Sequence, residues 1–444
     1  MIRTLFAAAF TLVASFAPSF APSFAHAEIN IEEITTPGGI RAWLVQEHSI
    51  PFTALEIRIR GGANLDEPGK RGAVNLMTAL LEEGSGDIDA RTFAAQREAL
   101  AATFGFDVYD DTFSVSAQFL TENRTAALGL LRGALIEPRF DADAIERVRA
   151  QVQSIIESDA LDPQSLAGDA FNAAAFGDHP YGSSLNGTAE TVAALTRDDL
   201  ISAHRNVLTR DRIFVGAVGD ITPEELGVIL DDLLGDLPAE GPPLPPKVAL
   251  GLGGGVTVID FPGPQSVALF GHTGITRDDP DYFAAFLLNY ILGDGGFESR
   301  LMQEVREKRG LTYGIGTYLV PKDLSEMVLG SVTSANETMA EAIDVIRAEW
   351  ARLATDGVTQ AELDAAKTFT TGEYPLRFDG NAPIAGILVG MQMIGLPADY
   401  VTNRNDYINA VTLDDVNRVA AYLLQPDALH FVVVGQPVGL ESTQ

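Results

Sequence analysis

The sequence predicts an α+β fold made of two homologous domains, because it carries an internal repeat, a proline- and glycine-rich break near its middle and mixed strand and helix patterns. The repeat consists of two motifs: residues 195–200 match residues 411–416, and residues 214–219 match residues 430–435. Both matches have the same offset of 216 residues, so the spacing between the motifs is kept in each half. Two motifs in register favour a duplicated domain.

Each copy of the first motif contains Thr-x-Asp-Asp, which is typical of a helix start. A threonine hydroxyl accepts a hydrogen bond from a free backbone N–H, and acidic side chains are favoured in the first turn by the helix dipole. The second motif is a short apolar run that ends in glycine, as a buried strand does. We therefore expect an amphipathic helix followed by a strand at corresponding places in the two halves.

Residues 238–255 separate the halves. Five prolines and five glycines lie in this segment, and such a density cannot continue a helix or a central strand. A proline-rich stretch behaves as a semi-rigid linker. The expected organisation is an N-terminal domain over residues 28–237, a linker over residues 238–255 and a C-terminal domain over residues 256–444.

Local patterns within the halves favour layers of strands and helices. Residues 55–60 and 113–119 alternate between polar and apolar side chains, as half-buried strands do. Residues 73–83 and 143–158 have apolar side chains at helical spacing. Because strands and helices do not simply take turns along the chain, antiparallel sheets with packed helices are expected.

Composition limits the classes of partner. The chain has 444 residues, of which 46% are hydrophobic and 20% charged, and this predicts a well-buried core rather than disorder. A formal net charge of -31 argues against binding to nucleic acid, whose phosphates attract Lys and Arg, and against an anionic membrane surface. The negative charge is compatible with an acidic cavity that binds basic peptides, and equally with a surface whose charge only keeps the protein soluble.

Cysteine is absent, and this excludes disulfides, a thiolate nucleophile and a Cys-bound metal. Six histidines are present and no two of them lie within five residues of each other. A pair of zinc ligands on successive turns of one helix therefore cannot be made from histidine.

The first 27 residues have the form of an export signal. Arg3 supplies a positive charge, residues 5–16 form a short apolar run, and Ala25-His26-Ala27 is a cleavage site of the A-x-A type. We expect cleavage after Ala27 and a periplasmic or secreted protein, with an uncleaved anchor as the alternative. The run is shorter than the roughly 20 residues that span a bilayer, and the apolar residues 384–396 fit a buried helix better, so no stable membrane insertion is expected.

Three segments give the chain a family resemblance. Residues 55–68 combine a strand with the turn Gly-Gly-Ala-Asn-Leu-Asp-Glu-Pro, residues 292–301 are glycine-rich, and residues 305–313 read Val-Arg-Glu-Lys-Arg-Gly-Leu-Thr-Tyr. Together they resemble the M16 family of insulinase- or mitochondrial-processing-peptidase-like enzymes over nearly the whole mature chain. The resemblance implies two homologous α+β domains that form half of a clam-shell chamber.

Residues 72–85 resemble the frame of the zinc helix of that family, but they lack its chemistry. Active members carry H-x-x-E-H there; the two His positions fall on Asn75 and Ala79, and the position of the general base falls on Thr78. Alanine neither binds a metal nor transfers a proton. The family's later Glu ligand corresponds to Glu157, although a polar residue near a helix end explains Glu157 as well. One carboxylate is short of the three protein ligands that catalytic zinc takes, so no zinc and no other cofactor is expected in this chain.

The second half keeps residues that the family uses on its substrates. The resemblance implies that Arg306 and Tyr313 face the zinc across the chamber and bind the substrate backbone and the developing oxyanion. The pattern predicts a helix over residues 298–309, a stop at Gly310, and a strand over residues 311–319 with Tyr313 on the same face as Leu311 and Ile315. The simpler alternative is a solvated helix end and an ordinary strand aromatic.

The glycine-rich loop is a candidate for substrate binding through Gly293, Gly295 and Gly296, again by resemblance. A plain turn between helices is the alternative. No Gly-Lys-Ser/Thr follows, so the loop does not match a phosphate-binding loop.

The leading hypothesis is a non-zinc subunit of a heterodimeric periplasmic M16 metallopeptidase, which supplies Arg306 and Tyr313 to a partner that carries H-x-x-E-H and zinc. Unfolded peptides would be the substrates. The alternative is a catalytically inert pseudopeptidase that acts as a peptide-binding or assembly scaffold. A chain that is active alone would need a non-zinc site, for which the sequence offers no candidate.

Overall fold

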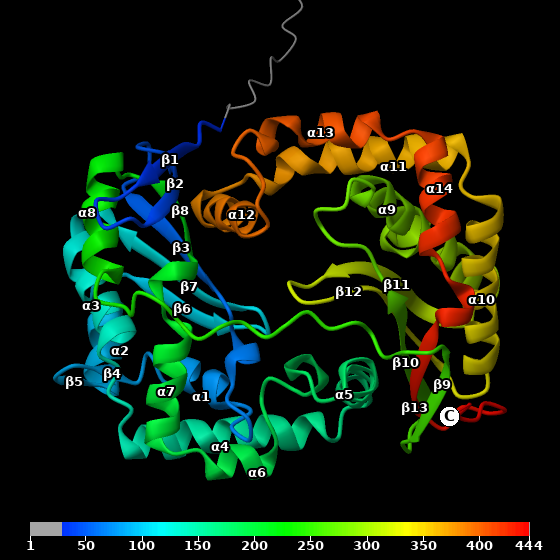
Figure 1. The fold of residues 1–444 in the computed structure, drawn as a ribbon, viewed down its shortest axis with the longest axis horizontal. Coiled ribbons are helices and arrows are strands. Elements are labelled where there is room, and N and C mark those ends of the chain that lie inside the picture. The colour runs from blue at the N-terminus through cyan, green and yellow to red at the C-terminus, as the bar shows by residue number, and fades with distance from the viewer. Residues whose placement is uncertain (1–28, 444) are drawn as a thin grey trace, which may run out of the picture.

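The computed structural model describes residues 29–443. The expected signal peptide over residues 1–27 and its cleavage after Ala27 lie outside this part of the chain. Figure 1 shows two sheets, each with helices packed against it, on opposite sides of the molecule. Within residues 29–443, none of the helices combines the length and the apolar character that crossing a bilayer requires.

The N-terminal sheet has six strands in the order β1-β2-β8-β3-β7-β6. The β2–β8 pair is parallel and the other pairs are antiparallel. Alternating polar and apolar residues bury one face of the long β3 strand, as the sequence pattern predicts. The strands are β1 (Glu32–Thr35), β2 (Arg41–Gln46), β3 (Phe52–Arg60), β6 (Thr103–Val108), β7 (Thr112–Leu120) and β8 (Ile213–Gly219), and a short separate hairpin consists of β4 (Gly84–Ser85) and β5 (Ile88–Asp89).

The C-terminal sheet has five strands in the order β11-β12-β10-β13-β9, and its only parallel pair among the described strands is β13–β9. Read from β9, this is the order of the N-terminal sheet from β2 onward. The matched order and the matched parallel pair confirm the predicted fold of two homologous α+β halves. The strands are β9 (Gly255–Asp260), β10 (Gln265–Thr273), β11 (Thr312–Pro321), β12 (Glu326–Ala335) and β13 (His430–Gly435).

Helices cover the sheets of both halves (Figure 1). In the first half they are α1 (Ala73–Ala79), α2 (Ala90–Ala99), α3 (Arg124–Ile136), α4 (Ala142–Asp159), α5 (Pro163–Phe176), α6 (Ala189–Ala194), α7 (Arg197–Val207) and α8 (Pro223–Leu234). In the second half they are α9 (Tyr282–Asn289), α10 (Met339–Asp356), α11 (Gln360–Glu373), α12 (Asn381–Met393), α13 (Tyr400–Ala410) and α14 (Leu413–Leu423).

The repeated Thr-x-Asp-Asp motifs start α7 and α14. Thr196 accepts a hydrogen bond from the backbone N–H of Asp199, whose side chain bonds back to the N–H of Thr196. Thr412 and Asp415 form the same reciprocal pair at the start of α14. Both helix starts are capped as the sequence predicts.

The two halves exchange a helix. Helix α12 of the second half packs on β8 and β3 of the N-terminal sheet, and α5 of the first half packs on β10 and β13 of the C-terminal sheet (Figure 1). Ala385 and Leu388 of α12 share an apolar cluster with Trp43 and Val218. On the other side, Phe171, Ala175 and Phe176 of α5 share a cluster with Met327 and Val432. Each sheet therefore depends on the other half for part of its cover.

Glycine at position 216 lets α12 approach the N-terminal sheet closely. A Cβ atom at Gly216 would lie 2.5 Å from the carbonyl oxygen of Ala385 and 3.2 Å from the Cβ of Leu388. Gln392 adds a hydrogen bond of 2.7 Å from its side-chain nitrogen to the carbonyl of Val215. Helix and sheet are thus in near-backbone contact at this crossing.

Two hairpin turns that correspond in the repeat meet between the halves. Lys322 in the β11–β12 turn pairs with Asp110 in the β6–β7 turn at 2.6 Å. The backbone N–H of Asp323 donates to the carboxylate of Asp111 over 3.2 Å, and Arg60 pairs with Asp323 at 3.1 Å. These partly buried contacts fix one half against the other.

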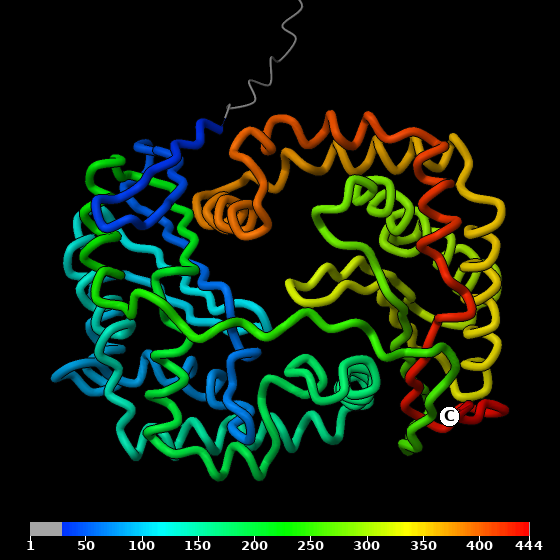
Figure 2. The backbone as a smooth tube through the Cα atoms, viewed as in Figure 1, coloured from blue at the N-terminus to red at the C-terminus, as the bar shows by residue number. Residues whose placement is uncertain are grey.

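Residues 235–254, between α8 and β9, form no helix or strand. Figure 2 shows this stretch crossing from one half to the other as a long extended trace. It is held by backbone hydrogen bonds from Val248 to Leu324 at 2.9 Å and from Gly251 to Ala175 at 2.8 Å. The domain limits at residues 237 and 256 stay a prediction.

Candidate functional site

Helix α1 begins in a turn that is held by a buried carboxylate. Asp66 accepts hydrogen bonds from the backbone N–H groups of Gly72 at 2.9 Å and Val74 at 2.8 Å. Gly72 has φ = 95°, a left-handed conformation that glycine adopts without strain. Burial raises the pKa of Asp66 to about 6, although these amides and Arg71 favour the charged form.

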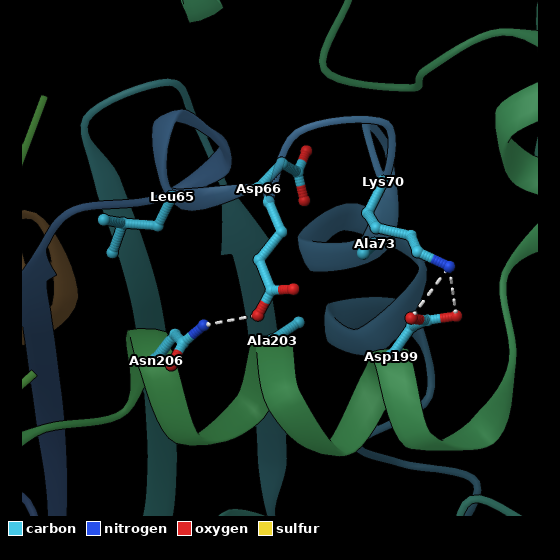
Figure 3. Close-up of a pocket in the computed structure, with 8 residues that line it drawn as sticks. Leu65, Asp66, Lys70, Ala73, Asp199, Ala203 and Asn206 are labelled. Carbon is cyan, nitrogen blue, oxygen red and sulfur yellow. Dashed lines mark hydrogen bonds and ion pairs between the residues drawn. The ribbon is translucent and has the colours of Figure 1, made fainter. Parts of the chain in front are cut away.

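Polar contacts to α7 hold the same turn from the other side. Figure 3 shows Lys70 reaching Asp199 of α7, an ion pair of 3.0 Å. Glu67 accepts hydrogen bonds from Ser202 at 2.7 Å and Asn206 at 3.4 Å. The space enclosed here, about 10 Å³, has room for at most one water. The protein's own polar contacts therefore hold the frame of the helix.

The three motif positions on α1 carry no zinc chemistry. Asn75 donates from its side-chain nitrogen to Asn186 over 3.0 Å, and Thr78 is buried with its hydroxyl donating to the carbonyl of Val74 at 2.8 Å. Ala79 is exposed and has no donor atom. Two ligands and a base are thus replaced by an amide pair, an intrahelical hydrogen bond and a methyl group. These residues do not fit a catalytic zinc ion.

The amide pair of Asn75 and Asn186 is joined by a hydrogen bond to the carboxylate of Asp159. Asn186, the partner of Asn75, donates to Asp159 over 3.4 Å, whereas Glu157 is exposed and makes no hydrogen bond or ion pair to a described residue. The buried face of α4 explains this, since Val148 and Val152 lie on the same face as position 159 but not as position 157. In the sequence, the helical spacing of Val148, Val152 and position 159 is the signal that places Asp159 on the inner face of α4. Among residues 29–443, no three His, Cys, Asp or Glu side chains gather as a metal site would require.

The glycine-rich loop lies against β11. Gly293 belongs to a π-helical turn, Tyr290–Asp294, and a Cβ atom there would overlap Thr317 of β11. A Cβ atom at Gly295 would lie 2.7 Å from the carbonyl oxygen of Tyr290. Gly296 has φ = 57° and open space around it. Close packing therefore explains why Gly293 and Gly295 are glycines. Gly296 allows the backbone to turn before Phe297.

Arg306 lies in a second π-helical turn, Met302–Glu307. The sequence predicts one continuous helix over residues 298–309, but the structure has a 3₁₀ turn, Gly296–Glu298, before the helical residues begin. The guanidinium of Arg306 lies 4.5 Å from the centre of the Phe297 ring. Its nearest carboxylate is that of Glu307, at 3.7 Å from Nε. The neighbouring cations, Lys308 and Arg309, have a close carboxylate partner, because Glu304 pairs with them at 2.5 Å and 2.7 Å.

Tyr313 is the most exposed large hydrophobic side chain of the described residues, at 87%. The predicted face is wrong: Leu311 and Ile315 are both 6% exposed and point into the core, away from Tyr313. The cause is a β-bulge, since the pairing of β11 with β12 shifts between Thr312 and Ile315. Thr312 stabilises the bulge by donating to the carbonyl of Thr333 over 2.6 Å. The extra residue turns the tyrosine outward.

The end of the π-helical turn and the start of β11 lie side by side. The backbone N–H of Leu311 donates to the carbonyl of Val305 over 3.0 Å, and that of Gly310 to the carbonyl of Arg306 over 2.8 Å. Gly310 has φ = 65°, as predicted for a helix stop. Arg306 and Tyr313 are thus carried by adjacent segments, and no hydrogen bond joins their side chains. Both side chains keep their hydrogen-bond donors available.

Two family profiles match the chain. Residues 41–189 match the profile described as insulinase, peptidase family M16, and residues 194–369 match the profile described as the peptidase M16 inactive domain. Both profiles belong to one family, and together they span most of the described residues.

This chain is similar to relatives named as zinc proteases and to one named as a non-peptidase. A non-peptidase homolog, YmxG, of Helicobacter pylori is 24% identical over 88% of this chain and 90% of its own length. An uncharacterized zinc protease of Mycobacterium leprae is 28% identical, with 88% of each chain covered. Overall similarity therefore does not separate zinc proteases from non-peptidases. The distinction depends on the residues at positions 75, 78 and 79.

Solved structures with the same fold include one described as a peptidase M16 inactive domain from Pseudomonas fluorescens. It superposes with a TM-score of 0.86 at 28% identity and covers 93% of this chain and 99% of its own. A protease from Helicobacter pylori superposes with a TM-score of 0.81 at 16% identity, which shows the fold alone.

Proposed function

We propose that this chain, which belongs to the insulinase (M16) family of peptidases, is the zinc-free subunit of a heterodimeric peptidase. Its partner would be a homologous subunit with an intact H-x-x-E-H motif and bound zinc. The observation that carries the proposal is an asymmetry between the halves. The zinc-motif positions of α1 hold Asn75, Thr78 and Ala79, whereas Arg306 and Tyr313 keep accessible donors.

Arg306 and Tyr313 suit the task of binding a peptide carbonyl. A guanidinium and a phenol both donate hydrogen bonds, and donors placed at a carbonyl that gains negative charge stabilise the transition state. The donors of Arg306 are available because its nearest carboxylate, that of Glu307, lies 3.7 Å from Nε, beyond hydrogen-bond distance. The bulge at Thr312 exposes Tyr313. In the complex these donors would act on a substrate held by the partner's zinc site.

The substrates in this proposal are unfolded peptides, and the compartment is the periplasm or the outside of the cell. Strands β6 and β11 are the edge strands of their sheets, and an extended peptide can add to such an edge through backbone hydrogen bonds, largely independent of sequence. Gly293, Gly295 and Gly296 shape the loop beside β11. The net charge of -31 favours basic peptides. The export signal predicted over residues 1–27 supports the compartment.

The test is to purify the complex of this chain with an H-x-x-E-H subunit and to measure cleavage of a quenched fluorogenic peptide. Arg306→Ala and Tyr313→Phe should each lower kcat/KM by roughly 100-fold or more, the cost of one oxyanion donor. Arg377→Ala, which removes an exposed arginine paired with Glu373, is the control and should leave the rate unchanged. Rates unaffected by Arg306→Ala and Tyr313→Phe would overturn the proposal.

A second candidate is an inert pseudopeptidase that binds peptides or organises an assembly. The similarity to the non-peptidase homolog of Helicobacter pylori favours it. Under this alternative the chain binds peptide or partner without raising the cleavage rate of any complex. Co-purification separates the two: a zinc-bearing homologue whose activity requires this chain supports the first, and a complex without peptidase activity supports the second.

A further inference from the structure

We infer that Phe297 is a positioning residue for Arg306, holding its guanidinium against a ring face while its hydrogen-bond donors stay free for a substrate. The inference rests on the proposed function of Arg306 and adds a residue to it. Phe297 lies in the glycine-rich loop, nine residues before Arg306, and its ring contacts the guanidinium of Arg306.

The ring of Phe297 lies outside the apolar core. It is 58% exposed, and among residues 29–443 it stacks with no other aromatic ring. It belongs to none of the apolar core clusters. A side chain that stays more than half exposed gains little burial energy. The guanidinium of Arg306, 4.5 Å from the ring centre, is the cation that this ring contacts.

The backbone around Phe297 is fixed to the helix that carries Arg306. Gln303, in the same π-helical turn as Arg306, donates from its side-chain nitrogen to the carbonyl of Phe297 over 2.7 Å. Ser299 donates from its hydroxyl to the carbonyl of Gly296 over 2.8 Å. The loop and the helix therefore hold ring and guanidinium in one arrangement.

A ring face suits this purpose better than a carboxylate. A carboxylate at hydrogen-bond distance occupies the N–H donors of a cation, as Glu304 does for Lys308 and Arg309. The carboxylate of Glu307 lies 3.7 Å from Nε of Arg306, beyond hydrogen-bond distance. A cation over a ring face is attracted without giving up a hydrogen-bond donor, because the attraction comes from the ring quadrupole. Arg306 is thus oriented and still able to bind a carbonyl.

The kinetic test uses the complex with the H-x-x-E-H subunit and a quenched fluorogenic peptide. Phe297→Leu should lower kcat/KM by roughly 2- to 5-fold, the size expected for an exposed cation–ring contact. Phe297→Tyr keeps the ring face and should restore most of the rate. Tyr422→Ala, which removes an aromatic side chain of 46% exposure on α14, is the matched control and should have no effect.

A double-mutant cycle separates positioning from direct contact. In an Arg306→Ala background, Phe297→Leu should have no further effect on kcat/KM, since its role acts through Arg306. An undiminished loss in that background would overturn the inference. If Phe297→Leu has no effect while Arg306→Ala does, the inference fails and the proposed function stands.

A spectroscopic readout on the isolated chain does not depend on the partner. The side-chain protons of Arg306 should show ring-current shifts in NMR spectra that disappear in Phe297→Leu and persist in Phe297→Tyr. Shifts that are unchanged in Phe297→Leu would contradict the ring contact. If the shifts behave as expected and Arg306→Ala leaves peptide cleavage unchanged, the proposed function has failed and the inferred role of Phe297 in catalysis fails with it.

Discussion

Trp350 donates its indole N–H to the ring nitrogen Nε2 of His272 over 2.9 Å, deep in the C-terminal core. The other ring nitrogen, Nδ1, bonds to the backbone carbonyl of Thr273 at 2.7 Å, so it carries the proton. A ring that accepts at one nitrogen and donates at the other is neutral. Burial lowers the pKa of His272 below the ordinary value of 6.5.

His272 should make the protein less stable in acid. The unfolded chain takes up a proton below pH 6.5, whereas the folded ring does not, so stability falls as the pH drops through that value. We expect Tm to fall between pH 7 and pH 5 more steeply in the wild type than in His272→Gln. The variant has a lower Tm at pH 7.5, since the indole of Trp350 loses its partner. Equal slopes in calorimetry would contradict this account.

Glu56 should have the opposite effect. This half-buried residue of β3 makes no hydrogen bond to a described residue, and burial raises its pKa from 4.5 to about 7. The folded state binds the proton more tightly, so the stabilisation is present below pH 4.5 and is lost as the pH rises to 7. Glu56→Gln should raise stability at pH 8 by about 1 kcal/mol after allowance for partial exposure, and change little at pH 4.5. Urea unfolding at the two pH values measures the difference.

Gly216→Val should loosen the contact between α12 and the N-terminal sheet. The new side chain meets the backbone of Ala385, and overpacking of this kind costs about 1–3 kcal/mol. Gly129→Ala is the matched control, because Gly129 lies in the exposed face of α3 with nothing within 4 Å of a new Cβ. That change should be neutral or stabilising by up to about 1 kcal/mol. Chemical denaturation of both variants tests the pair; similar effects would refute the close approach.

Restoring the zinc motif should reveal which acidic residue lies within reach of it. We expect the wild-type chain to bind no stoichiometric zinc, and the variant Asn75→His, Thr78→Glu, Ala79→His to bind it weakly, as measured by calorimetry. In that background Asp159→Ala should weaken zinc binding by roughly 10-fold or more, while Glu157→Ala should not. The reason is the link from position 75 through Asn186 to Asp159. A larger effect of Glu157→Ala would show that the network does not mark the ligand position.

The fold could be predicted from the sequence because its signals are local or repeated. The Thr-x-Asp-Asp motifs cap α7 and α14, and a fixed offset between two motifs is enough to reveal the duplication. The stop at Gly310 was equally readable, since a helix that ends in glycine has a specific backbone requirement.

The site could be predicted only in part because its details depend on tertiary pairing. The bulge that exposes Tyr313 arises from the register of β11 against β12, which alternation along one strand does not encode. The ring contact of Arg306 joins a loop to a helix, and the exchange of α5 and α12 joins two halves of the chain. None of these relationships has a periodic signature in the sequence.

The exchange of α5 and α12 also bears on how the chain can be divided. A cut in the extended segment 235–254 would leave the halves clasped together, because each would still hold the other's helix against its sheet. Expressed separately, each half would bear an uncovered apolar sheet face and an unsupported helix, and would be prone to aggregate. The two copies of the repeat therefore need each other to cover their sheets. An ancestor with a single copy would have had to form a dimer in which each subunit's helix covered the other subunit's sheet.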